Sequence, residues 1–196
     1  MNINKKGIRV LAIAESFRKE KTKSILTGVV MRKDLIIDGI IFGSATIRGD
    51  DATQNIIRMY KSLQRNDINF LLLDGLIISM YNIIDGKTIH DNIGIPVIAI
   101  TFKNSQGIEY SIKKHFPSNY NNKLDNLKKL GKRNLVLLKT DKFLWIRIWG
   151  IKLDDAIKLL NSFLIQGSIP EPIKLAKMIS HAYLNTIYDN NRNSIR

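Results

Sequence analysis

One continuous apolar stretch, Asn69-Phe70-Leu71-Leu72-Leu73-Asp74-Gly75, constrains the fold more than any other part of the sequence. An apolar run without alternation is typical of a strand that is covered on both faces, as in the centre of an α/β sheet. The strand would end at Asp74, and α/β folds place their sites at the carboxyl ends of such strands. An Asp-Gly pair also favours a simple turn for reasons of backbone conformation alone. The positions of the other acidic residues in the chain distinguish a simple turn at Asp74 from a carboxylate that belongs to a site.

The composition predicts a single basic domain. The chain has 196 residues, of which 44% are hydrophobic, and this is enough for one sizeable core. It carries 31 Lys and Arg against 17 Asp and Glu, which gives a formal charge of +14. Such an excess attracts polyanions, with nucleic acid as the first expectation, although a basic composition can also serve solubility alone.

Two absences narrow the classes of protein further. The chain contains no cysteine, so disulfides, thiolate zinc sites and cysteine nucleophiles are excluded. Any metal would be held by carboxylate or imidazole groups, and Mg²⁺ or Mn²⁺ suit carboxylates best. No apolar run reaches the roughly 18 residues that a membrane-spanning helix needs. We expect a cytoplasmic protein without a membrane anchor.

The order of the elements predicts a ribonuclease H-like α/β fold, a mixed sheet flanked by helices. Three antiparallel strands come first, and parallel strands that alternate with helices follow. The expected elements are strands 8–15, 25–31 and 35–42, helix 50–65, strand 69–74, loop 76–85, strand 97–102, polar helices 106–133, strands 134–139 and 143–149, and helices 153–165 and 171–188. Asp38-Gly39 within the third strand suggests a bulge or the close approach of a neighbouring segment. We expect one domain over residues 1–189 and a disordered tail at 190–196.

Acidic residues fall where these elements begin or end. In the ribonuclease H-like arrangement the first and fourth strands are adjacent, so Glu15 and Asp74 would be neighbours. Asp50 and Asp51 open the helix, where capping explains one acid but does not require two. Two carboxylates about 4 Å apart repel by roughly 4 kcal/mol at an effective dielectric of about 20, and a divalent cation turns this repulsion into affinity. The expected chemistry is phosphodiester hydrolysis with bound Mg²⁺, on a substrate docked by the basic surface.

Several short motifs support this interpretation. In chain order they are Ile13-Ala14-Glu15, Arg48-Gly49-Asp50-Asp51-Ala52-Thr53, Leu73-Asp74-Gly75, Tyr81-Asn82-Ile83-Ile84-Asp85, Gly94-Ile95-Pro96-Val97-Ile98 and Ile169-Pro170-Glu171-Pro172-Ile173-Lys174-Leu175-Ala176. Together they resemble an archaeal family, formerly uncharacterised and now described as endonuclease dU. The resemblance covers nearly the whole chain. That family is similar in turn to endonuclease V, a ribonuclease H-like enzyme that nicks nucleic acid near deaminated bases with Mg²⁺.

The resemblance implies a metal site made of carboxylates. The implied ligands of Mg²⁺ or Mn²⁺ are Glu15, Asp50, Asp51 and Asp74. Glu15, Asp51 and Asp74 form the expected catalytic set. The chain departs from the family pattern at two positions. Ala14 stands where the first of two adjacent acids is expected, which leaves Glu15 to act alone, and Lys177 stands where a His is expected.

Other polar and aromatic residues have both a functional and a structural interpretation. We expect Tyr81, Asn82 and Lys174 to bind the substrate, with Tyr81 stacking on or wedging beside a displaced base, although a half-buried structural tyrosine fits equally well. Asp85 is better explained as a helix cap than as a site acid. The strand 143–149 alternates aromatic residues and Arg in the manner of a stacking platform for single strands. Packing beneath a helix or at a homodimer contact is the commoner role of such rings.

Three functions follow from these features. The first is a Mg²⁺-dependent endonuclease that acts on DNA with deaminated bases such as uracil, in DNA repair. The second is a nuclease of the same chemistry that acts on RNA. The third is a nucleic-acid-binding module that has lost catalysis, because Ala14 replaces an acid.

Overall fold

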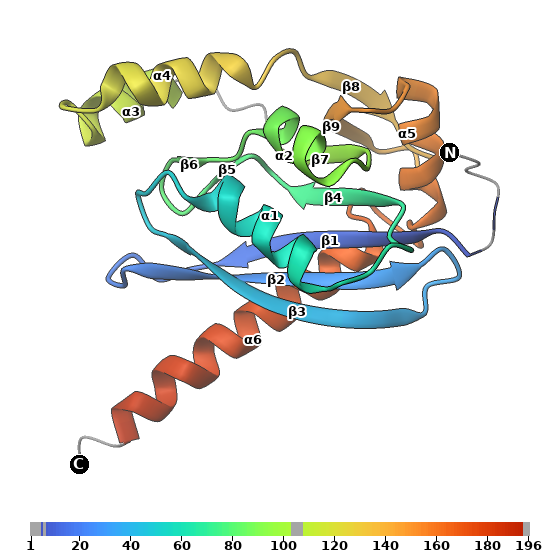
Figure 1. The fold of residues 1–196 in the computed structure, drawn as a ribbon, viewed down its shortest axis with the longest axis horizontal. Coiled ribbons are helices and arrows are strands. Elements are labelled where there is room, and N and C mark those ends of the chain that lie inside the picture. The colour runs from blue at the N-terminus through green and yellow to red at the C-terminus, as the bar shows by residue number, and fades with distance from the viewer. Residues whose placement is uncertain (1–4, 6, 103–107, 194–196) are drawn as a thin grey trace.

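A seven-stranded mixed sheet forms the centre of the computed structural model, which describes residues 5, 7–102 and 108–193 (Figure 1). The strands of this sheet are β1 (Arg9–Ser16), β2 (Lys23–Arg32), β3 (Ile37–Thr46), β4 (Phe70–Asp74), β7 (Val97–Thr101), β8 (Asn134–Leu137) and β9 (Phe143–Trp149). A two-stranded sheet consists of β5 (Ile77–Ile78) and β6 (Asn82–Ile83). The helices are α1 (Ala52–Ser62), α2 (Gly86–Ile93), α3 (Ile108–His115), α4 (Tyr120–Lys129), α5 (Leu153–Ser162) and α6 (Glu171–Asn193). None of the helices in these described ranges has the length and apolar character needed to cross a bilayer.

The strand order β3-β2-β1-β4-β7-β9-β8 confirms the ribonuclease H-like arrangement. β1, β2 and β3 are antiparallel, whereas β4 pairs in parallel with both β1 and β7. β9 is antiparallel to β7 and to β8, so a hairpin completes the sheet beyond the parallel strands. The first and fourth strands are therefore neighbours, as the order of elements predicts.

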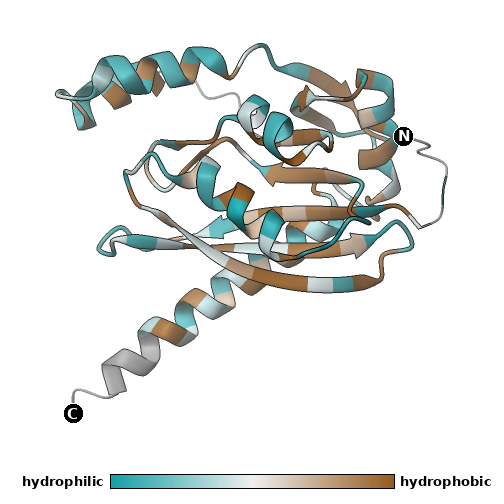
Figure 2. Ribbon diagram, in the orientation of Figure 1, coloured by the Kyte–Doolittle hydropathy of each residue, from teal (hydrophilic) through white to brown (hydrophobic). Residues whose placement is uncertain are grey.

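Side chains of the central strands alternate between two hydrophobic clusters, one on each face of the sheet. The first cluster contains Leu11 and Leu73 and includes residues of α1 and α2, and the second contains Ala14 and Phe70 and includes residues of α5 and α6. Every residue from Phe70 to Leu73 is at most 1% exposed. Burial of each large apolar side chain contributes roughly 1.5–3 kcal/mol, so an unbroken apolar run is stable here. Figure 2 shows the central strands in brown and α4 mostly in teal.

The expected bulge in the third strand is present. Val30 pairs with Gly39 and Met31 pairs with Ile37, so Asp38 is left without a partner in the ladder. Bulges increase the local twist of an edge strand and redirect a side chain. Here the extra residue brings the Asp38 carboxylate into an ionic network.

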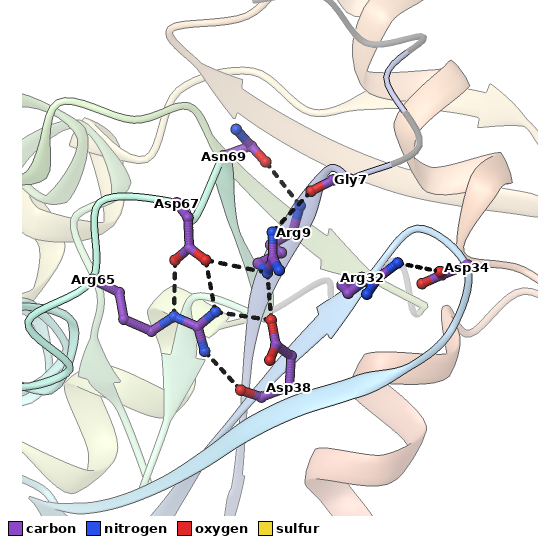
Figure 3. Close-up of polar contacts among 8 residues, drawn as sticks. All are labelled: Gly7, Arg9, Arg32, Asp34, Asp38, Arg65, Asp67 and Asn69. Carbon is purple, nitrogen blue, oxygen red and sulfur yellow. Dashed lines mark hydrogen bonds and ion pairs between the residues drawn. The ribbon is translucent and has the colours of Figure 1, made fainter.

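This network ties β3 to the amino-terminal ends of β1 and β4 (Figure 3). Asp38 accepts hydrogen bonds from Arg9 and, at 2.8 Å, from Nη2 of Arg65. Arg65 also donates two hydrogen bonds of 2.8 Å to Asp67, which lies 3.2 Å from Nε of Arg9. Such a bidentate, four-residue network has more defined geometry than an isolated surface ion pair. It lies at the end of the sheet opposite to the carboxyl end of β4.

Several element boundaries differ from the expected ones. α6 continues to Asn193, whereas the sequence predicts a tail from residue 190, because no Gly or Pro interrupts the helix after its first turn. Residues 194–196 lie outside the described residues, as do residues 106 and 107 of the expected polar helices. Figure 1 shows the carboxyl-terminal part of α6 extending away from the sheet.

The Asp38 network predicts a pH-dependent contribution to stability. Hydrogen bonds from Arg9 and Arg65 lower the pKa of Asp38 from 3.8 to about 2. Because the folded pKa lies below the unfolded one, the stabilisation is fully present above the unfolded value and is lost as the pH falls from about 4 towards 2. We expect Asp38→Asn to lower Tm near pH 7, and the difference from wild type to shrink near pH 2. Asp34→Asn, which removes only an exposed pair with Arg32, should change Tm less. A difference in Tm that is independent of pH would contradict this account.

Candidate functional site

The carboxyl ends of β1 and β4 lie side by side and define the candidate site. Ile13 pairs with Leu73, so one further step along both parallel strands places Ala14 beside Asp74. Successive side chains of a strand point to opposite faces of the sheet. Ala14 and Asp74 therefore share the face covered by α6, and Glu15 points to the other face. The two strand ends meet as expected, and both Glu15 and Asp74 line one small pocket, but their side chains diverge.

On the α6 face, the Asp74 carboxylate pairs with an ammonium group. Nζ of Lys177 lies 2.8 Å from Oδ2 of Asp74, whose side chain is only 14% exposed. The same ammonium lies 5.7 Å from the centre of the Phe102 ring. The position next to Asp74 on β1 is the buried methyl group of Ala14. Asp74 is therefore neutralised by a cationic side chain, with no carboxylate at the adjacent strand position.

On the opposite face, Glu15 holds the hairpin between β5 and β6. Its carboxylate accepts a hydrogen bond of 3.0 Å from the backbone N–H of Ser79 and another from the Ser79 hydroxyl. Ser79, Met80 and Tyr81 all have positive φ angles, of 44°, 55° and 76°. Non-glycine residues in this region cost on the order of 1 kcal/mol or more each. The contacts of Glu15 help to offset that strain, so this carboxylate positions the hairpin.

Asp51 lies at the start of α1 but does not cap it. Its carboxylate accepts hydrogen bonds from the N–H and hydroxyl of Thr46, at 2.9 and 2.7 Å, and from the side-chain amide of Asn82, at 2.8 Å. Burial acts to raise the pKa of Asp51, but the Thr46 and Asn82 hydrogen bonds, together with Lys23, hold it well below its usual range. Asn82 accepts a hydrogen bond from the N–H of Ala52, 3.2 Å away, and so takes the capping role expected of the acid.

Asp50 pairs with a buried lysine of α4. Lys123 is 1% exposed, and its Nζ donates hydrogen bonds of 2.6 Å to Asp50, 2.6 Å to the Gly49 carbonyl and 2.9 Å to the Tyr81 carbonyl. The polar composition of the helices expected over residues 106–133 suggests solvent-facing lysines, but Lys123 is enclosed. Lys123 precedes Leu127 and Leu130 at helical spacing; Leu130 is buried in the core and Leu127 packs against it. This periodicity could have indicated its burial.

The expected substrate-binding residues have different environments. Tyr81 is half-buried, and its ring lies 5.9 Å from the ring of His115 and 5.8 Å from that of Phe116. Asn82 is fully buried, so its side chain acts on the site through Asp51 and does not reach a ligand directly. Lys174 lies in the first turn of α6 and pairs with Glu171 at 2.5 Å. Tyr81 and Lys174 therefore retain exposed surface, whereas the Asn82 amide is enclosed.

Two structural interpretations from the sequence are confirmed. Asp85 caps α2, because its carboxylate accepts a hydrogen bond of 3.0 Å from the N–H of Thr88. Trp149 of β9 packs beneath α2, so close to Gly86 that a Cβ atom there would clash with the ring. This part of β9 serves packing. Trp145 instead stacks with Arg133, whose guanidinium carbon lies 5.2 Å from the ring centre.

A cavity of about 490 Å³ adjoins the end of β4. Gly75, Leu76 and Ile77 form one wall, and Arg133 and Arg147 line it from the segment after α4 and from β9. Nε of Arg147 donates a hydrogen bond of 3.0 Å to the Gly131 carbonyl, which fixes the side chain. Sequence analysis missed this cavity, because Arg133 and Arg147 are 14 residues apart and belong to different elements. Two arginines beside apolar walls can bind a phosphate and an apolar or aromatic group together.

The four acidic residues expected to bind a metal ion do not form one donor set. Asp74 pairs with Lys177, Asp50 with Lys123, Asp51 with Thr46 and Asn82, and Glu15 with Ser79. Within the part of the chain that the structure describes, no three acidic or histidine side chains come close enough to hold a metal ion. A hard cation needs several oxygen ligands around one point. The four carboxylates as arranged therefore do not fit the expected ion site.

Comparison with protein families and sequences identifies relatives over almost the whole chain. A family model described as endonuclease dU matches residues 6–184. A UPF0215 protein of Pyrobaculum calidifontis is 33% identical over 171 residues, which cover 87% of this chain and 93% of that protein.

Comparison with solved structures agrees with the observed fold. A protein of unknown function from Archaeoglobus fulgidus superposes with a TM-score of 0.78 at 23% identity, covering 90% of this chain and 98% of that one. Endonuclease V of Ciona intestinalis, in complex with DNA containing an inosine, gives a TM-score of 0.62 at 17% identity, covering 93% and 87% of the two chains.

The contacts of Lys123 predict that this lysine stabilises the site region. We expect Lys123→Met to lower the free energy of unfolding by roughly 2 kcal/mol, because two carbonyl oxygens and Asp50 lose their donor while the apolar stem is kept. Urea denaturation measures the change. Lys129→Met, on the exposed side of the same helix, is the matched control and should change stability by less than about 0.5 kcal/mol. Equal effects of the two variants would contradict the buried role of Lys123.

Proposed function

Because the chain belongs to the archaeal endonuclease dU family, we propose that it acts on DNA that contains deaminated bases such as uracil, in DNA repair. Family membership and the likeness to endonuclease V support a nuclease that acts on nucleic acid. The observation that carries the proposal is the family match over residues 6–184, which includes the end of β4 and both arginines of the adjoining cavity. The formal charge of +14 supplies long-range attraction for a polyanion.

The proposed reaction is hydrolysis of a phosphodiester bond. Mg²⁺ or Mn²⁺ would assist such a hydrolysis, but the carboxylates of the described residues do not form a site for either ion as they are arranged. The residues of the chain itself provide binding: Arg133 and Arg147 would hold backbone phosphates, and the apolar wall at Leu76 and Ile77 would contact a base. Tyr81, half-buried on the hairpin beside α3, would stack against a displaced base. RNA remains the alternative to DNA as the substrate.

A second candidate function is a module that binds the same DNA but does not cut it. The observation in its favour is that Ala14 and Lys177 are the neighbours of Asp74. Ala14 provides no carboxylate on the adjacent strand, and the ammonium group of Lys177 already pairs with Oδ2 of Asp74. Recognition by the arginine-lined cavity does not depend on either residue, so binding would persist without hydrolysis.

Binding and cleavage of matched oligonucleotides test the proposal. We expect the wild-type chain to bind a uracil-containing oligonucleotide about tenfold more tightly than its thymine counterpart, a difference of about 1.4 kcal/mol. Equal affinities for the uracil-containing and thymine-containing oligonucleotides would contradict the proposal. Nicking that requires Mg²⁺ and is lost in Asp74→Ala would identify the nuclease, whereas tight binding without product would identify the second candidate. Parallel assays with inosine-containing RNA show whether RNA is preferred.

The arginine-lined cavity predicts a specific loss of affinity. Arg147→Gln should weaken binding to all oligonucleotides by about tenfold and reduce the slope of log K against log salt by about one, because one phosphate contact is lost. Fluorescence anisotropy at several salt concentrations measures both quantities. Arg58→Gln, at an exposed position on α1 outside the cavity, has the same change in charge and serves as the control. If the two variants behave alike, the cavity does not bind phosphate.

A further inference from the structure

The surroundings of Asp74 differ from those of a metal-binding carboxylate. A divalent cation at the end of β4 would draw its ligands from this strand and from its neighbour, about 4.8 Å away. The neighbouring position is Ala14, which is 2% exposed and packs in the same hydrophobic cluster as Ala176 of α6. The side of Asp74 that faces β1 is therefore lined by a methyl group.

The next acid along β1 cannot compensate for this alanine. Glu15 points to the opposite face of the sheet, where Ser79 donates two hydrogen bonds to its carboxylate. A turn of Glu15 towards Asp74 would release the hairpin of positive-φ residues that it holds. The Glu15 carboxylate therefore has a structural role, which is to hold the β5–β6 hairpin.

The charge that Asp74 needs comes from α6. Burial of a carboxylate is unfavourable unless a cation or hydrogen-bond donors compensate it. Lys177 supplies an ammonium group 2.8 Å from Oδ2, and a divalent cation at that oxygen would be repelled by this positive charge. The Lys177 side chain is 44% exposed, so its ammonium is also accessible to a nucleic-acid phosphate.

We infer that Lys177 takes the place of a divalent cation at Asp74, and that this chain binds nucleic acid without a metal ion at that strand end. The inference rests on the proposed recognition of nucleic acid, and it favours binding over metal-dependent cleavage. Ala14 and Lys177 act together here. The alanine removes a ligand for the ion, and the lysine neutralises the single acid that remains.

Titration of the full chain with Mn²⁺ by isothermal titration calorimetry tests the inference. We expect the wild type and Asp74→Asn to give the same titration curve, because Asp74 holds no ion. The double variant Ala14→Asp, Lys177→His should gain a site at least tenfold tighter than any in the wild type, and adding Asp74→Asn should remove it. Thermal unfolding confirms that each variant is folded. A Mn²⁺ site in the wild type that Asp74→Asn abolishes would overturn the inference.

A second measurement uses the wild type alone and so does not depend on the double variant. Its affinity for the uracil-containing oligonucleotide should be equal in EDTA and in Mn²⁺ at matched ionic strength. A requirement for Mn²⁺ would overturn the inference while leaving the proposed substrate intact. If the wild type binds uracil-containing and thymine-containing oligonucleotides equally and has no Mn²⁺ site at Asp74, the proposed function is contradicted. The assignment of Lys177 would still hold in that case.

Discussion

The parallel pairing of β1 with β4 is the constraint on which the site depends. This register sets Ala14, rather than Glu15, beside Asp74. Because side chains alternate between the faces of a sheet, a difference of one residue decides whether two acids can share an ion. Asp74 is directed towards α6, where it pairs with Lys177, and Glu15 is directed towards the β5–β6 hairpin, where it binds Ser79. The chemistry available at this edge follows from that separation.

The excess of positive charge is also used inside the site. Lys123 and Lys177 each neutralise one of the acids expected to bind a metal ion, and Lys123 additionally joins α4 to the hairpin at Tyr81. A lysine that is 1% exposed is stable only because three acceptors surround its ammonium group. The basic character of the chain therefore has two consequences. It attracts a polyanion at long range, and it supplies lysines that neutralise site carboxylates in place of a metal ion.

The sequence predicts the order of elements, the bulge at Asp38 and the cap at Asp85, because each depends on local patterns. The adjacency of β1 and β4 follows from the match between this order and the ribonuclease H-like arrangement. Side-chain direction at the site could not be predicted in the same way. It depends on the register between strands that are 60 residues apart, and one residue changes the face. The role of Asn82 as the cap of α1, in place of Asp51, also depends on a contact distant in sequence. The departures at Ala14 and Lys177 were visible in the sequence, but only the fold shows that they flank the same carboxylate.

The most direct measurement is an anomalous difference map from crystals of the wild-type chain soaked in Mn²⁺. The account predicts no peak within coordination distance of Asp74 and an ammonium group of Lys177 still in contact with its carboxylate. A strong peak that bridges Asp74 and Glu15, with Lys177 displaced, would contradict it.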